Sequence, residues 1–146
     1  MPRLLIFAPC KIAILEKDSF NLSLISVLEH INLTIPKGIK IPERVLAPFD
    51  WSIVTVWLQE PGDEAKQFIQ HTELILSNGE LGSTSDFAFY LTERTHRVIV
   101  SVPGFPIGQP GECMIRLSLA ERGGQKALVV VEYPLVVNHI LEDTTT

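Results

Sequence analysis

The sequence has few cysteines and no long apolar run. Its two cysteines, Cys10 and Cys113, are too few for a disulfide framework, and we expect two buried free thiols in a reducing compartment. The apolar stretch at residues 4–8 is too short for a signal-peptide core, and no run approaches the length of about 18 residues that indicates a membrane helix. These absences predict a cytoplasmic protein that does not enter a membrane.

Positive charge is also scarce. The chain has 146 residues, with 12 Lys and Arg against 17 Asp and Glu, and its formal charge is −5. Nucleic-acid binding needs clustered basic residues that neutralise phosphates, and binding to an anionic membrane needs the same. We therefore expect neither nucleic acid nor a membrane surface as a partner.

Recognisable catalytic and cofactor motifs are missing as well. The sequence contains no Gly-x-Ser-x-Gly elbow, phosphate-binding loop, dinucleotide fingerprint or Cys-x-x-Cys pair. Its four histidines, His30, His71, His96 and His139, show no spacing typical of metal ligands. We therefore expect no enzymatic activity, no metal and no cofactor.

What the sequence does contain is side-chain alternation with a period of two. Residues 113–121 are the clearest case, because Cys113, Ile115, Leu117 and Leu119 are apolar and predict a strand with its odd-numbered positions inward. The stretch Phe49–Gln59 is apolar on both faces, which is typical of a central strand.

Turn-forming residues separate the alternating stretches. Residues 16–19, Asn78-Gly79 and Gly123-Gly124 each predict a hairpin turn. The apolar phase flips near residues 29–30, which predicts a β-bulge. Pro134 predicts an edge position or a bulge in the last strand.

About eight strands and no convincing helix predict an all-β protein. We expect residues 1–140 to form a single two-layer antiparallel β-sandwich, and residues 141–146 to form a frayed tail. A tryptophan on an early central strand and the entry Pro110-Gly111-Glu112 to a late strand favour an immunoglobulin-like variant. Cys113 occupies the place where a tyrosine commonly follows this entry, and a C2-like or jelly-roll topology stays open.

Four stretches spread over most of the chain carry a resemblance to a known family. They are Arg3–Cys10, residues 22–31 with the Pro-containing loop that follows, Ser77-Asn78-Gly79 and Pro110-Gly111-Glu112. Together they resemble a family of small bacterial proteins that is described as a domain of unknown function. The resemblance implies a cytosolic bacterial β-sandwich without an assigned activity, and it transfers no catalytic residue.

Two loops rich in proline and glycine are the predicted contact surface. Residues 36–48 and 103–111 are irregular connections, and such connections carry function more often than strands do. Their candidate contact residues are Ile39, Ile41, Phe105 and Ile107. We expect Phe105 to be the exposed aromatic anchor. The leading hypothesis is a non-enzymatic interaction or structural module that binds a protein partner or a second copy of itself, through these loops or an exposed strand edge.

Two other hypotheses belong to different classes of protein. The first is a carbohydrate or small-ligand binding module with an aromatic platform formed by Trp51, Trp57, Phe49 and Phe105. A candidate anion site is formed by Arg94, His96 and Arg97 in a polar turn. The second, less favoured, is a hydrolase that uses His96 and a neighbouring acid.

Overall fold

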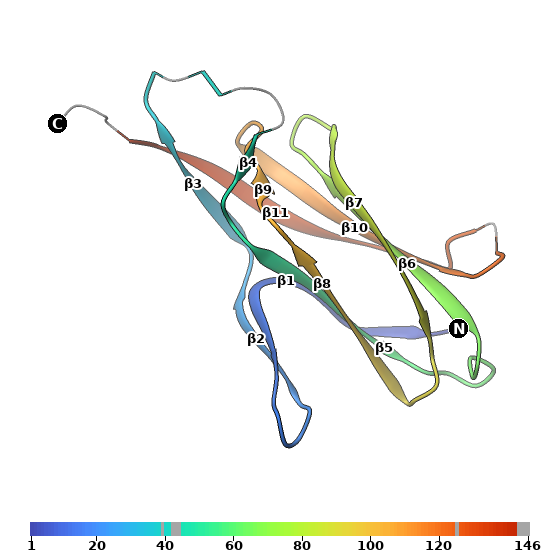
Figure 1. Ribbon diagram of the computed structural model, residues 1–146. Helices are drawn as coiled ribbons and strands as arrows, with labels where there is room; N and C mark the ends of the chain where they lie inside the picture. Colours follow the sequence, from blue (N-terminus) through green and yellow to red (C-terminus); the bar gives the residue numbers. More distant parts are fainter. Residues whose placement is uncertain (39, 42–44, 125, 143–146) are drawn as a thin grey trace.

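Strands form all of the regular secondary structure in the described part of the chain (Figure 1). The computed structural model describes residues 1–38, 40–41, 45–124 and 126–142. These ranges contain no helix, and therefore none that is long and apolar enough to cross a membrane. The predicted all-β class is confirmed, with eleven strands instead of about eight. The strands are β1 (Arg3–Leu15), β2 (Leu22–Val27), β3 (His30–Pro36), β4 (Leu46–Ala47), β5 (Trp51–Leu58), β6 (Gln67–Ile75), β7 (Leu81–Tyr90), β8 (Thr95–Val102), β9 (Phe105–Pro106), β10 (Gly111–Glu121) and β11 (Val129–Glu142).

The long strands form two sheets that pack face to face. Sheet A has the order β2-β1-β5-β8, sheet B has the order β3-β11-β10-β6-β7, and β4 and β9 form a short ribbon. Side-chain contacts show which strands oppose each other. Phe7 of β1 packs edge-on against Tyr133 of β11. Trp57 of β5 donates a hydrogen bond to Gln70 of β6, and His96 of β8 stacks on Phe89 of β7. The predicted two-layer sandwich is confirmed.

The strand connectivity is immunoglobulin-like. Strands β5 and β8 pair in sheet A, while β6, β7, β10 and β11 lie together in sheet B. This arrangement corresponds to strands B and E opposite strands C, C′, F and G of that fold. One described pair departs from the predicted antiparallel arrangement, because β3 runs parallel to β11.

The apolar phase flip near residues 29–30 marks a change of sheet. Strand β2 pairs with β1 in sheet A as far as Val27, and β3 pairs with β11 in sheet B from His30 onward. The predicted bulge is therefore wrong, because the inward direction reverses when the chain crosses between layers. Ile31, Leu33 and Ile35 of β3 then face the core and are buried.

Three other sequence predictions can be checked strand by strand. The odd-numbered positions of β10 from Cys113 to Leu119 are buried, and β5 is buried on both faces, as predicted. Pro134 pairs with β10 on one side only, because the pairing of β11 with β3 begins two residues later, at Val136. Pro134 is therefore at an edge position, one of its two predicted settings. The predicted tail starts too early, because Leu141 and Glu142 still pair with β3, and residues 143–146 lie outside the described residues.

Buried polar side chains divide the core into two apolar clusters. Ile53 and Leu74 belong to one cluster, Trp57 and Phe68 belong to the other, and Gln70 lies between them. Thr55 Oγ1 donates a hydrogen bond of 2.6 Å to Gln70 Oε1, and Trp57 Nε1 donates one of 2.9 Å to the same oxygen. The amide Nε2 of Gln70 is buried without a partner among the described residues.

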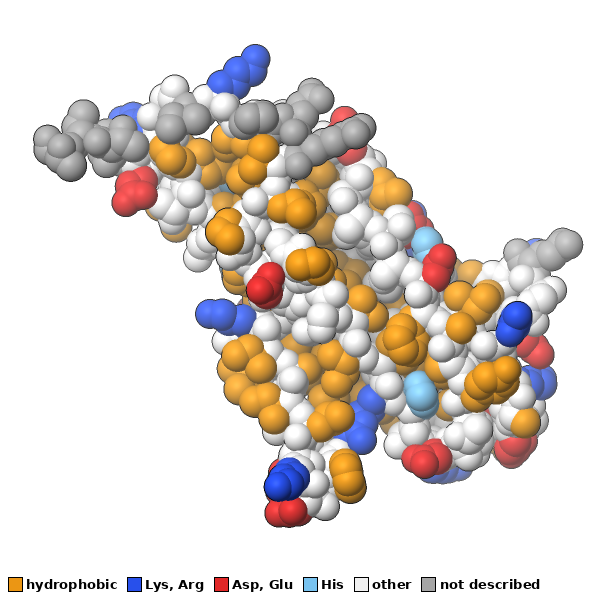
Figure 2. Space-filling model, viewed as in Figure 1, with side chains coloured by type: hydrophobic (Ala, Val, Ile, Leu, Met, Phe, Trp, Pro, Cys, Tyr) orange, Lys and Arg blue, Asp and Glu red, His pale blue; other side chains and the backbone are white. Residues whose placement is uncertain are grey.

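The β1–β2 hairpin extends from the sandwich as an arm, which comprises residues 11–27 (Figure 1). Strand β1 pairs with β5 as far as Cys10, and beyond that residue it pairs with β2 alone. Figure 2 shows hydrophobic side chains along the arm and charged side chains at its tip. Arg97 of β8 connects the tip of the arm to sheet A, because its Nη1 donates a hydrogen bond to the carbonyl oxygen of Phe20.

Candidate functional site

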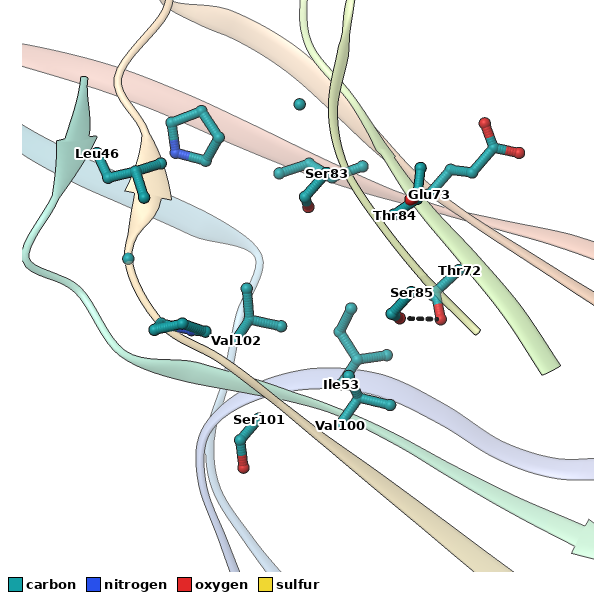
Figure 3. A pocket seen from close by; sticks show the side chains of 15 residues that line it. Leu46, Ile53, Thr72, Glu73, Ser83, Thr84, Ser85, Val100, Ser101 and Val102 are labelled. Atoms are coloured by element: carbon teal, nitrogen blue, oxygen red, sulfur yellow. Dashed lines mark hydrogen bonds between the residues drawn. The ribbon is translucent and has the colours of Figure 1, made fainter. Parts of the chain in front are cut away.

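An open cleft of about 310 Å³ lies between the edge strands β7 and β8 (Figure 3). Strand β8 ends sheet A and β7 ends sheet B, so each has a paired neighbour on one side only among the described strands. The two free edges lie on the same side of the sandwich, because β8 packs against β7. The cleft is therefore bordered by backbone that lacks a strand partner.

The floor of the cleft is apolar. Ile53, Val100 and Val102 line it from sheet A, and Leu74 lines it from sheet B. Figure 3 shows Ile53, Val100 and Val102 on one side of the cleft, opposite Ser83 of β7. Because Ile53 and Leu74 belong to the core, the floor is an open end of the core.

The wall formed by β7 and β6 carries small and hydroxylated side chains. Residues 82–85 of β7 are Gly-Ser-Thr-Ser and all line the cleft, and Ser85 Oγ donates a hydrogen bond of 3.1 Å to Thr72 Oγ1. Among the described residues that line the cleft, none is Lys, Arg or His, and Glu73 is the single charged one. The wall thus leaves space and offers neutral hydrogen-bonding groups.

The turn before β9 forms the rim of the cleft. Gly104 has a φ of +75°, and a Cβ added there would lie 3.1 Å from Leu46 Cβ and 3.2 Å from the carbonyl oxygen of Ala47. The Trp51 indole Nε1 donates a hydrogen bond of 3.0 Å to the carbonyl oxygen of Gly104. Only glycine fits this turn without strain, and its bond to a buried indole holds the rim in place.

A stacked aromatic pair joins β7 and β8 outside the residues that line the cleft. His96 of β8 lies on Phe89 of β7, with ring centroids 4.6 Å apart and ring planes 5° from parallel. Burial lowers the pKa of His96 below its ordinary value, and this effect outweighs the opposite effect of Glu93. The imidazole is therefore neutral near pH 7, and the stack links the two sheets without a buried charge.

The predicted anion site of Arg94, His96 and Arg97 is not assembled. His96 points inward to Phe89, whereas the neighbouring Arg97 bonds to the arm, because successive side chains of a strand point to opposite faces. Arg94 is exposed in the turn before β8. The three side chains therefore do not converge on one ligand.

The expectation that Phe105 is exposed is wrong. Its side chain is 0% exposed and packs on Trp51, with ring centroids 5.6 Å apart. Ile41 and Ile107 are half-buried, and Ile39 lies outside the described residues. The loop at 103–111 folds back onto the core, because its aromatic side chain finds an apolar partner there.

The predicted aromatic platform is also wrong. Trp51 and Trp57 are 2% and 0% exposed, and Phe49 is half-buried against the same core as Phe105. Sugar rings stack on exposed aromatic faces, and these faces are covered by the opposite sheet or by neighbouring loops.

A polar cluster that was not predicted from the sequence lies on the outer face of sheet B, where two carboxylates flank His71. Asp86 Oδ1 lies 2.5 Å from His71 Nδ1, and Glu73 Oε1 lies 3.3 Å from His71 Nε2. Strand register brings them together, because residue 71 of β6 pairs with residue 86 of β7. No cluster of His, Cys, Asp and Glu in the described residues has a metal-binding arrangement, and we interpret this one as a surface polar cluster.

No model of a known protein family matches the chain, and no curated protein matches its sequence.

Proposed function

We propose that the protein is a non-enzymatic interaction module, and that it binds an extended segment of a partner protein in the cleft between β7 and β8. The observation that carries this proposal is the combination of an unpaired strand edge with an apolar floor. Edge backbone groups can form main-chain hydrogen bonds to an added strand. The place beside β8 corresponds to strand D of many immunoglobulin-like domains, and no described strand occupies it.

The lining defines the chemistry of the segment. Inward side chains would contact Ile53, Val100 and Val102, so they should be apolar, and the volume of about 310 Å³ limits them to small ones. Alternate side chains would point outward, as they do along any strand. The described lining offers no cation for an acidic segment, and the carboxylate of Glu73 lies beside His71 on the outer face of sheet B. We therefore expect a neutral segment in which apolar residues alternate with polar ones.

A binding role fits the hydroxyl groups of the cleft better than catalysis does. Ser85 donates its hydroxyl hydrogen to Thr72, and no histidine is among the described residues of the lining. A serine or threonine nucleophile needs an adjacent base to accept its proton. Among the described residues of the lining, no histidine lies beside the hydroxyl group of Ser85 or Thr72 to accept its proton.

A small neutral ligand is the second candidate for the same cleft. Its volume lies at the lower end of the range for small-molecule sites, about 300–1,000 Å³. The carbohydrate version of this hypothesis lacks its main support, because Trp51 and Trp57 are buried. Cytoplasmic location and membership of the uncharacterised bacterial family stay predictions.

Selection of displayed peptides tests the proposal. Random peptides of about twelve residues, long enough to span an edge strand, are selected against the wild-type protein and then measured against Ser83→Trp and Val130→Trp. The indole of Ser83→Trp fills the cleft from an edge strand, whereas Val130 is exposed on β11, away from the cleft. We expect peptides with alternating apolar residues that lose at least about tenfold in affinity, or about 1.4 kcal/mol, for Ser83→Trp and nothing for Val130→Trp.

Equal binding of the selected peptides to both variants would contradict the proposal. Circular dichroism and urea unfolding of each variant control for loss of the fold. Binding of small neutral fragments that Ser83→Trp abolishes, without any peptide binding, would favour the second candidate.

A further inference from the structure

One side of the arm is an exposed aliphatic face. Ile12 and Ile14 of β1 and Ile25 and Val27 of β2 share this side. Ile12 pairs with Ile25 and Val27 pairs with Cys10, and directly paired residues of an antiparallel ladder point to the same side. These four side chains are 44–48% exposed. Soluble proteins rarely leave a contiguous aliphatic surface uncovered unless something binds to it. We call these four residues the aliphatic face.

The same arm carries an unprotected strand edge. Strand β2 is the first strand of sheet A, and its other edge has no partner among the described strands. Its sequence, Leu22–Val27, contains neither a charged residue nor a proline. The edge strand β3 of sheet B, by contrast, ends in Pro36. Strand β8 carries a charge at Arg97, outside the stretch Val100–Val102 that lines the cleft. Natural sheets use charge and proline to block edge-to-edge association, so β2 is open to it.

Strand β2 also matches the segment that the cleft should bind. Apolar and hydroxylated residues alternate over Leu22-Ser23-Leu24 and again over Ile25-Ser26-Val27, with a change of phase between Leu24 and Ile25, and the strand has no charge. The cleft has an apolar floor and a neutral wall, so no buried charge would lack a partner in the contact. In a chain of net charge −5, this pair of neutral surfaces also avoids like-charge repulsion.

We infer that the cleft of one copy receives β2 of a second copy, so that sheet A continues from one molecule to the next. The geometry permits this, because β2 and β8 are the two opposite ends of the order β2-β1-β5-β8. The aliphatic face of the incoming arm would then cover the floor formed by Ile53, Val100 and Val102. The inference rests on the proposed function, since it names a second copy as the source of the bound segment.

The predicted assembly is a chain of copies and not a closed two-fold dimer. Each copy offers one donor, the arm, and one acceptor, the cleft, and these are different surfaces. Such a head-to-tail contact continues indefinitely unless the rotation closes a ring. A contact that uses the same patch on both copies would stop at two, and this difference makes the inference testable.

Two single variants and their mixture provide the test. Ile25→Lys places a charge on the arm and leaves the cleft intact, and Ser83→Trp fills the cleft and leaves the arm intact. By sedimentation velocity, we expect wild-type protein to form dimers and larger species as its concentration rises, up to about 1 mM. Each variant alone should stay monomeric, with association weakened at least about a hundredfold. An equimolar mixture should form a heterodimer and nothing larger, because one intact arm meets one intact cleft.

Val130→Lys is the matched control for an added charge at an exposed apolar residue, and it should assemble like the wild-type protein. A wild-type chain that stays monomeric at every concentration would overturn the inference. So would a Ser83→Trp variant that assembles normally, or a mixture that gives no heterodimer.

The test separates this inference from the proposed function. If the wild-type protein is monomeric but the selected peptides bind in a manner that depends on Ser83, the segment comes from another protein and the inference fails alone. If neither copies nor peptides occupy the cleft, both fail.

Discussion

The buried amide of Gln70 gives the sharpest test of the core. Its Oε1 accepts hydrogen bonds from Thr55 Oγ1 and Trp57 Nε1, while its Nε2 is unpaired among the described residues. In Gln70→Leu, Thr55 Oγ1 and Trp57 Nε1 both lose their hydrogen-bond acceptor, while the unpaired Nε2 of Gln70 is removed. Two buried unpaired groups therefore replace one. Each buried unpaired group costs about 1–3 kcal/mol, and the added apolar side chain offsets part of that cost. We expect Gln70→Leu to lower the free energy of unfolding by about 1–2 kcal/mol.

A double-mutant cycle with Thr55→Val isolates the hydrogen bond. In the wild-type background, Thr55→Val removes one bond of ordinary strength, and we expect a loss of about 1 kcal/mol. In the Gln70→Leu background the same change removes a buried hydroxyl that has lost its acceptor, and we expect a gain of about 1 kcal/mol. The coupling between the two positions is therefore about 2 kcal/mol, which is within the range for residues in one network.

Urea unfolding followed by tryptophan fluorescence measures all four proteins. Trp51 and Trp57 are 2% and 0% exposed, so unfolding moves both indoles into water and changes their emission. Stabilities are compared at equal slopes of free energy against urea concentration. A Thr55→Val change that costs the same in both backgrounds, with coupling below about 0.5 kcal/mol, would refute the network.

Three further predictions follow from burial and backbone geometry. Burial lowers the pKa of His96 in the folded protein below 6.5, so the unfolded chain binds more protons and the free energy of unfolding should fall as pH drops below 6.5. His96→Phe should remove this part of the pH dependence in urea titrations, and a pH dependence equal to that of the wild type would contradict the burial of His96. Gly104→Ala should lower the urea midpoint by the equivalent of about 1–3 kcal/mol, because the turn needs positive φ and the added Cβ would approach Leu46, and a midpoint equal to that of the wild type would contradict the packing. Burial raises the pKa of both Cys10 and Cys113, so Ellman's reagent should react slowly with the native protein and rapidly with both thiols in urea; fast reaction of either native thiol would contradict its burial.

Local rules predicted the strands and turns well. The alternation in residues 113–121 predicts the buried side of β10, because a strand with one face on the core must alternate. Asn78-Gly79 forms the turn between β6 and β7, where Gly79 has the positive φ that this dipeptide favours. Such features depend on neighbours a few residues apart, so the sequence alone is enough.

Features that depend on distant segments were not predictable in the same way. Phe105 belongs to a loop of proline and glycine, and nothing local indicates that Trp51, in a separate strand, will cover it. The phase flip at residues 29–30 is visible in the sequence, but a bulge and a change of sheet produce the same pattern. Only the pairing of β3 with β11 distinguishes them.

The candidate site was also not predictable from the sequence, because it depends on segments that are distant in the chain. Ser83 and Ser85 are ordinary residues of an alternating strand, and their role in a cleft follows from β7 and β8 being the last strands of opposite sheets. The aliphatic side chains of the arm look like core residues in the sequence. They are exposed because the pairing of β1 with β5 ends at Cys10, while β1 and β2 continue beyond that point as a two-stranded hairpin. The composition of β1 does not indicate where this pairing ends.

The parallel pair of β3 and β11 joins segments from opposite ends of the chain. Asn138 Nδ2 donates a hydrogen bond to Asn32 Oδ1 across 106 residues. During translation, β11 is made after every other described strand, so Ile31, Leu33 and Ile35 emerge from the ribosome long before their neighbour exists. Sheet B is therefore completed only after synthesis has passed residue 142, and β3 waits for its pairing partner longer than any strand of sheet A does.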